Sequence, residues 1–150
     1  MALAVRAPRS AAGQGASAAA FALHYLLIGA ATGAAMSGLS VVQVATAWAD
    51  DRAWWQRAVF TATVPALAVL TASTWAGWPS ACVAAGMALA TVARWSRSAL
   101  LLRVLFLAAG SCWIVHDLLT GSTFGLLADL FCMVGLVVGA VRDRRAAVPA

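Results

Sequence analysis

The sequence has very few charged residues. Only 10% of its 150 residues are charged, and they are 10 arginines and 5 aspartates, with no lysine or glutamate. Soluble domains carry about a quarter charged residues, so this chain has no room for a hydrophilic domain. Hydrophobic residues make up 63% of the chain, and most of it must be buried in lipid or against itself. The composition therefore indicates a membrane protein.

The motifs of soluble catalysis are also absent. The sequence has no Ser-His-Asp order in a loop, no phosphate-binding loop and no Cys/His cluster. Cys82, Cys112 and Cys132 lie far apart in apolar segments, as buried thiols do. The net charge of +5 does not indicate nucleic-acid binding, because the arginines lie at the ends of apolar runs and form no stripe. We expect no enzyme, no cofactor, no metal site and no nucleic-acid partner.

Apolar runs predict six transmembrane helices. Their ranges are 16–30, 33–48, 58–75, 79–93, 99–119 and 122–141. Several are shorter than the ~20 residues of an average span and would need a thin or locally adapted bilayer. Residues 1–15 are expected to be a disordered or cytoplasmic N-terminal segment, and residues 146–150 a cytoplasmic tail.

The arginines gather on one side of the predicted membrane. They precede the first helix, follow the last, and occupy the connections after the second and fourth helices. Arg103 lies one turn inside the fifth helix and can snorkel to the same side. The turns near Ala31, Gly77 and Thr120 carry none. The positive-inside rule then predicts a multi-pass membrane protein with both termini cytoplasmic.

The N-terminal region repeats the C-terminal region without gaps. His24-Tyr-Leu-Leu-Ile-Gly29 aligns with His116-Asp-Leu-Leu-Thr-Gly121. Both hairpins cross the membrane in the same direction, so an axis along the membrane normal relates them. The simplest unit has three helices. Residues 77–145 would form a complete repeat, residues 57–76 a linker helix, and residues 16–56 an incomplete repeat without its first helix.

A specific pattern marks the second repeat. Arg103 begins its middle helix, and Trp113-x-x-His116-Asp117-x-x-x-Gly121 ends it. In this pattern the chain resembles the YgjV-type bacterial inner-membrane proteins, which are distantly related to the PQ-loop and SWEET sugar transporters. The resemblance implies an all-α membrane protein with SWEET-like triple-helix-bundle repeats and transport of a small molecule. The chain departs from the family in having six helices instead of seven, no Pro-Gln dipeptide, and His-Asp where the relatives have Tyr-Gly.

The resemblance also implies a substrate cavity. In the sugar-transporting relatives a Trp of the middle helix and an Asn of the third helix line it, and the matching positions here are Trp113 and Asp129. A carboxylate within the membrane is costly unless it is paired or hydrated, and His116 is the expected partner. We predict that one wall of the cavity is formed by Trp113, His116 and Asp129, and the opposite wall by Phe21, His24 and Ser37.

Other interpretations of these residues stay open. A carboxylate in place of the amide favours a polar or cationic ligand, or proton coupling, over a sugar. The His-Asp pair could also only hold two helices together in a membrane scaffold or sensor, and two histidines at one depth would suit a bis-His haem site. Gln43 is expected to form a hydrogen bond between helices. The surface left by the missing helix is expected to contact a second copy of the chain, or else to make the isolated chain unstable.

Overall fold

The computed structural model describes residues 7–46, 54–96 and 98–146 of the chain. Within these ranges it is all-helical and contains no strand, as the sequence predicts. The helices are α1 (Ala7–Leu27), α2 (Ala31–Thr46), α3 (Trp54–Ser73), α4 (Trp78–Trp95), α5 (Ala99–Thr120) and α6 (Thr123–Ala146).

The largest difference from the predicted helices is at the start of the chain. The predicted N-terminal segment 1–15 is helical from Ala7 onward, while residues 1–6 lie outside the described part. This segment is rich in alanine, which has the highest helix propensity of the amino acids. A prediction based on hydropathy missed this helical segment, because its alanines favour a helix without making it strongly apolar.

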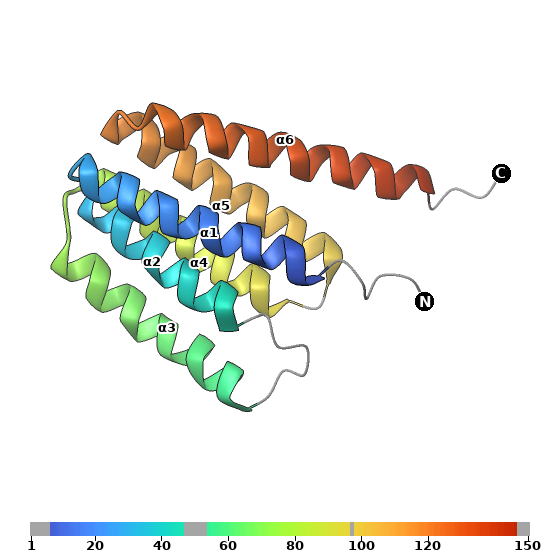
Figure 1. Cartoon of the computed structure of the whole chain (residues 1–150), viewed down its shortest axis with the longest axis horizontal. Helices are drawn as coiled ribbons and strands as arrows, with labels where there is room; N and C mark the ends of the chain where they lie inside the picture. Colours follow the sequence, from blue (N-terminus) through green and yellow to red (C-terminus); the bar gives the residue numbers. More distant parts are fainter. Residues whose placement is uncertain (1–6, 47–53, 97, 147–150) are drawn as a thin grey trace.

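Neighbouring helices run antiparallel, so their connections lie at two opposite ends of the molecule (Figure 1). At one end α1 and α6 have their chain termini, and we call it the arginine end, because Arg57, Arg94, Arg103, Arg142 and Arg145 lie in the terminal turns there. The other end, which we call the glycine end, has short turns through Gly29, Gly77 and Gly121. All three glycines have positive φ, and Gly121 caps α5 in the left-handed conformation.

The helices do not contact one another evenly. The closest packing is between α4 and α5, between α1 and α2, and between α5 and α6, while α3 and α6 lie at opposite edges (Figure 1). Met36, Val83 and Met87 form a buried core between α2 and α4, and Trp113 of α5 packs against it. By contrast, α1 makes few contacts with α5 and α6. The two hairpins are therefore separated along much of their length.

The outer surface of α5 and α6 is apolar. The segments Ala99–Thr120 and Thr123–Arg142 are long and apolar enough to cross a membrane, and no other helix in the described ranges meets the same measure. Most side chains of these two helices face outward, including Leu118, Phe124 and Phe131. The helices α1 to α4 contain more Ala, Gly, Ser and Thr, which lowers their hydropathy. Length and composition thus identify two of the predicted spans as able to cross a membrane.

Candidate binding cavity

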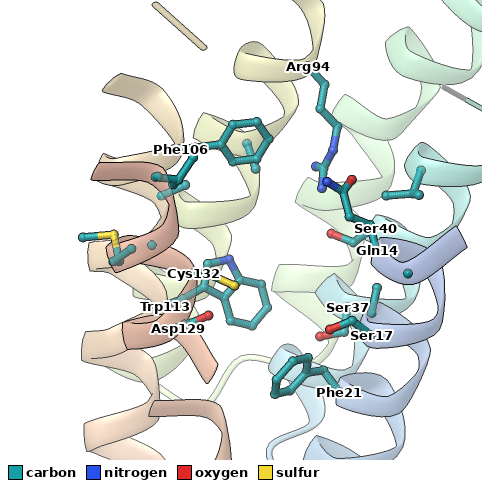
Figure 2. Close-up of a pocket in the computed structure, with 18 of the residues that line it drawn as sticks. Gln14, Ser17, Phe21, Ser37, Ser40, Arg94, Phe106, Trp113, Asp129 and Cys132 are labelled. Carbon is teal, nitrogen blue, oxygen red and sulfur yellow. The ribbon is translucent and has the colours of Figure 1, made fainter. Parts of the chain in front are cut away.

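A cavity of about 480 Å³ lies between the first hairpin, α1–α2, and the second hairpin, α5–α6, with α4 closing part of its wall (Figure 2). This volume is within the range of small-molecule sites. Its walls combine small, aromatic and polar side chains with two charged ones, Arg94 and Asp129. The main lining residues are Gln14, Ser17, Phe21, Ser37, Ser40, Arg94, Phe106, Trp113, Asp129 and Cys132.

Equivalent positions of the two aligned hairpins face the same cavity. Phe21 and Trp113 are separated by 92 positions, and so are Ser37 and Asp129. The other lining pairs with this separation are Gln14 and Phe106, Ser17 and Ala109, Ala18 and Gly110, Ser40 and Cys132, and Val44 and Leu136. Equivalent positions of the repeat therefore supply both walls of the cavity. The two charged residues have no charged equivalent, because Asp129 is matched by a serine and Arg94 by no residue of the first hairpin.

Four of the six predicted binding residues line this cavity. Trp113 and Asp129 lie on one wall, and Phe21 and Ser37 lie on the opposite one (Figure 2). A Cβ on Gly86 of α4 would lie 2.9 Å from Cδ1 of Trp113, so the glycine lets the indole pack tightly against α4. The two predicted histidines do not line the cavity.

His116 forms its hydrogen bond with α4 and not with Asp129. Its Nδ1 lies 2.8 Å from the carbonyl oxygen of Pro79, and the residue is 1% exposed. Its Nε2 has no hydrogen-bond partner in the described residues, and a Cβ on Gly33 would lie 2.7 Å from it. The expected His116–Asp129 pair is therefore wrong, because His116 faces α4 while α6 lies elsewhere around α5. The space at Nε2 is also too small for a haem.

His24 lies at the glycine end. Its Nε2 is 3.0 Å from Oγ of Ser122, at the turn into α6, and its ring meets the ring of Phe124 edge-on at 6.0 Å. This contact joins the end of α1 to the start of α6.

A second polar pair joins the hairpins beside it. The hydroxyl of Tyr25 donates a 2.6 Å hydrogen bond to Oδ1 of Asp117, and both residues are almost fully buried. These two residues are repeat equivalents, since the hydrogen bond spans 92 positions. A Cβ on Gly125 would lie 2.5 Å from both Oδ1 of Asp117 and Oγ of Ser122. Gly125 thus permits the close approach of α6, and we call this bonded region the closed end of the cavity.

The cavity is not sealed in the same way toward the arginine end. Its lining there includes Gly13, Gln14 and Ser17 of α1, and all three are exposed. Arg94 of α4 lies near the same level, with its guanidinium carbon 5.5 Å from the ring centre of Phe106 (Figure 2). The cavity therefore opens toward the end that carries the arginines.

Arg94 is held in place by a network of neutral groups. Its Nη1 donates a 2.8 Å hydrogen bond to Oε1 of Gln43. The amide nitrogen of Gln43 donates to Oγ1 of Thr63 at 3.1 Å and to Oγ1 of Thr91 at 2.8 Å, which confirms its expected role between helices. No carboxylate in the described part of the chain pairs with Arg94. Asp129 is also unsatisfied, because its buried Oδ2 has no hydrogen-bond partner among the same residues.

Sequence reasoning missed three residues of this region. Arg94 was expected to be one of several arginines at the membrane surface, and Tyr25 and Asp117 were not assigned to the site. The repeat alignment held a usable signal for the last two, since it pairs them directly. Residues at equivalent positions near an axis of symmetry can meet across it.

One comparison with known proteins gave a match. The family model Imp-YgjV, described as a bacterial inner membrane protein, matches residues 11–147. No curated protein and no solved structure matches the chain. The family match covers far more than half of the sequence, and it agrees with the apolar outer surface of α5 and α6. The chain therefore belongs to the YgjV family of bacterial inner membrane proteins.

Proposed function

We propose that this protein transports a small polar molecule across the inner membrane, and that the cavity between the two hairpins is its substrate site. The observation that carries the proposal is the asymmetry of the cavity along its length. It is closed at the glycine end by one buried and one partly buried hydrogen bond and opens at the arginine end. A substrate pathway with one closed and one open side is what alternating access requires.

The proposed topology has six membrane spans and two cytoplasmic termini. The helices have 16 to 24 residues, which correspond to roughly 24–36 Å, near the thickness of a bilayer core. The described arginines at helix termini lie at one end, and by the positive-inside rule that end is cytoplasmic. The cavity would then be open to the cytoplasm.

The proposed transport cycle opens the closed end. Release of the Tyr25–Asp117 and His24–Ser122 hydrogen bonds would let α1 move away from α5 and α6, with which it shares few other contacts. The matched lining positions of the two hairpins support a relationship to SWEET-like repeats, in which two similar units rock about a central site. Asp129 is the residue we assign to substrate recognition.

The test is uptake into proteoliposomes that contain the purified protein, with a panel of sugars, amines and amino acids. We expect concentrative exchange or facilitated uptake of at least one polar compound, and its loss in Asp129→Leu. A wild-type protein that takes up none of the panel, in a preparation that remains folded, would contradict the proposal.

A membrane scaffold or sensor without transport is the second candidate. The closed end favours it, because its buried polar groups act there as helix-to-helix contacts. A scaffold needs no cavity carboxylate, so Asp129→Leu would then leave its cellular phenotype unchanged and raise its stability, as replacement of a buried charge often does.

A further inference from the structure

We infer that the substrate of this cavity is a zwitterion of the amino-acid type, with its cationic group at Asp129 and its anionic group at Arg94. The inference rests on the proposed function and names its substrate class. It starts from the fact that the two charged residues of the cavity, although opposite in sign, do not pair with each other.

Asp129 provides the site for the cation. Its carboxylate lies within α6, away from the helix ends, and its buried Oδ2 has no hydrogen-bond partner in the described part of the protein. A carboxylate in that position is costly unless a positive charge or water reaches it. The rings of Trp113 and Phe21 line the same cavity from its two walls (Figure 2), and aromatic faces also attract cations. An ammonium group fits these surroundings better than a neutral sugar does.

Arg94 provides the site for the anion. A guanidinium has five N–H donors and prefers the two oxygens of a carboxylate or phosphate. Among the described residues Arg94 donates one hydrogen bond, from Nη1 to Oε1 of Gln43, and its guanidinium also lies over the ring of Phe106. The bonds from Gln43 to Thr63 and Thr91 keep this arrangement fixed. Arg94 is therefore held in a fixed position and keeps N–H donors that a ligand can use.

The spacing of the two groups limits the size of the ligand. Phe106 contacts Arg94, and Trp113 lines the same wall of the cavity as Asp129. These two rings are seven residues apart on α5, which corresponds to roughly 10 Å along the helix axis. Hydrogen bonds of about 3 Å at each end leave room for charged groups roughly 4–5 Å apart, which is the separation in extended 4-aminobutyrate. A short amino acid spans this distance, whereas a lone amine or carboxylate would engage one residue and leave the other unpaired.

The experiment compares four probes by calorimetry on the purified wild-type protein in detergent, three of which share a four-carbon chain. They are 4-aminobutyrate, butylamine, butyrate and glucose. We expect 4-aminobutyrate to bind at least about tenfold more tightly than each of the others, because it alone satisfies both charges.

Variants then assign each charge to its residue. Asp129→Asn should weaken 4-aminobutyrate about tenfold and leave butyrate unchanged, while Arg94→Gln should weaken 4-aminobutyrate and leave butylamine unchanged. Arg94→Lys tests folding, since it keeps the charge, and Arg57→Gln is the control, because it removes an exposed arginine outside the cavity. Equal weakening of all probes in both charge-removing variants would overturn the assignment.

Uptake of the same four probes separates this inference from the proposed function. Preferred binding of 4-aminobutyrate without uptake would retain the inference and contradict transport. Uptake of glucose or butylamine at the rate of 4-aminobutyrate would retain transport and overturn the inference. Binding of none of the four probes by the folded wild-type protein would also overturn the inference, and the wider uptake panel would then decide whether the protein transports.

Discussion

Asp117 and Asp129 lie on the two adjacent helices of the second hairpin, α5 and α6, but their surroundings differ. Asp117 accepts a hydrogen bond from Tyr25, and although its Oδ2 has no partner among the described residues, the close backbone of Gly125 blocks access to it. Asp129 lines a cavity of about 480 Å³. A buried carboxylate is costly in both places. At Asp117 the hydrogen bond from Tyr25 offsets part of that cost, whereas Asp129 faces a cavity, and this difference is the basis for proposing a structural role for the first and a binding role for the second.

The largest effect on the difference between Asp117 and Asp129 is expected when the carboxylate of the cavity is removed. Asp129→Leu should lower transport on the order of 100-fold, because the charge it offers to the substrate is lost. Its expression and thermal stability should equal or exceed those of the wild type, since an unpaired buried charge is removed. Asp117→Leu is the matched control and should lose stability first. Uptake and detergent melting curves measure both, and equal loss of stability in the two variants would remove the distinction.

The packing of the closed end can be tested with one methyl group. Gly125→Ala should destabilise the protein by about 3 kcal/mol, at the upper part of the range for overpacking, because its Cβ would meet Asp117 and Ser122 together. Gly135→Ala in the same helix is the control, since nothing lies within 4 Å of that position. Thermal unfolding of the purified variants compares them. Similar melting temperatures would show that α6 is not held closely there.

The hydrogen bond of the closed end is expected to have a smaller effect. Tyr25→Phe keeps the ring contacts with Phe21, Trp113 and His116 but removes the donor to Asp117. A bond to a charged group contributes about 2 kcal/mol, so the variant should melt earlier and expose the cavity from the glycine end more often. Uptake should become faster or leakier rather than stop. A complete loss of substrate binding would instead show that the Tyr25 hydroxyl, whose residue also lines the cavity, binds the substrate.

A swap of equivalent positions sharpens the role of the repeat. The double variant Ser37→Asp, Asp129→Ser moves the carboxylate to the opposite wall at the matching position. Because the two walls present equivalent backbone positions, we expect binding of 4-aminobutyrate within about tenfold of the wild type. The single variant Asp129→Ser should bind less tightly than the double one. No recovery in the double variant would show that the two walls are not equivalent for the ligand.

The sequence predicted the helices and four of the residues that line the cavity, and the reasons for success and failure differ by residue. The family resemblance implied Trp113 and Asp129, the repeat alignment added Phe21 and Ser37, and all four line the cavity. The partner of His116 was missed because one residue turns a helix by about 100°. That rotation sends His116 toward Pro79 and Asp117 toward Tyr25, and only the packed neighbours determine which helix each one meets.

Arg94 was missed for a different reason. An arginine at the end of an apolar run looks the same in sequence whether it faces headgroups or a cavity. Its hydrogen bond to Gln43 and its contact with Phe106 come from α2 and α5, which are distant in sequence. The bounds of α1 were missed because alanine-rich sequence is helical without being strongly apolar.

Access to Cys132 tests the central claim of a cavity open only at the arginine end. Cys132 lines the cavity from α6 and is the sole cysteine left after Cys82→Ser and Cys112→Ser. A membrane-impermeant maleimide should label it from the cytoplasmic face of oriented vesicles, not from the other face, and 4-aminobutyrate should slow the labelling. Phe131→Cys in a Cys132→Ser background is the control, since Phe131 is exposed, does not line the cavity, and would face lipid. Labelling of Cys132 from the opposite face alone, or at the slow rate of the Phe131→Cys control, would contradict the account.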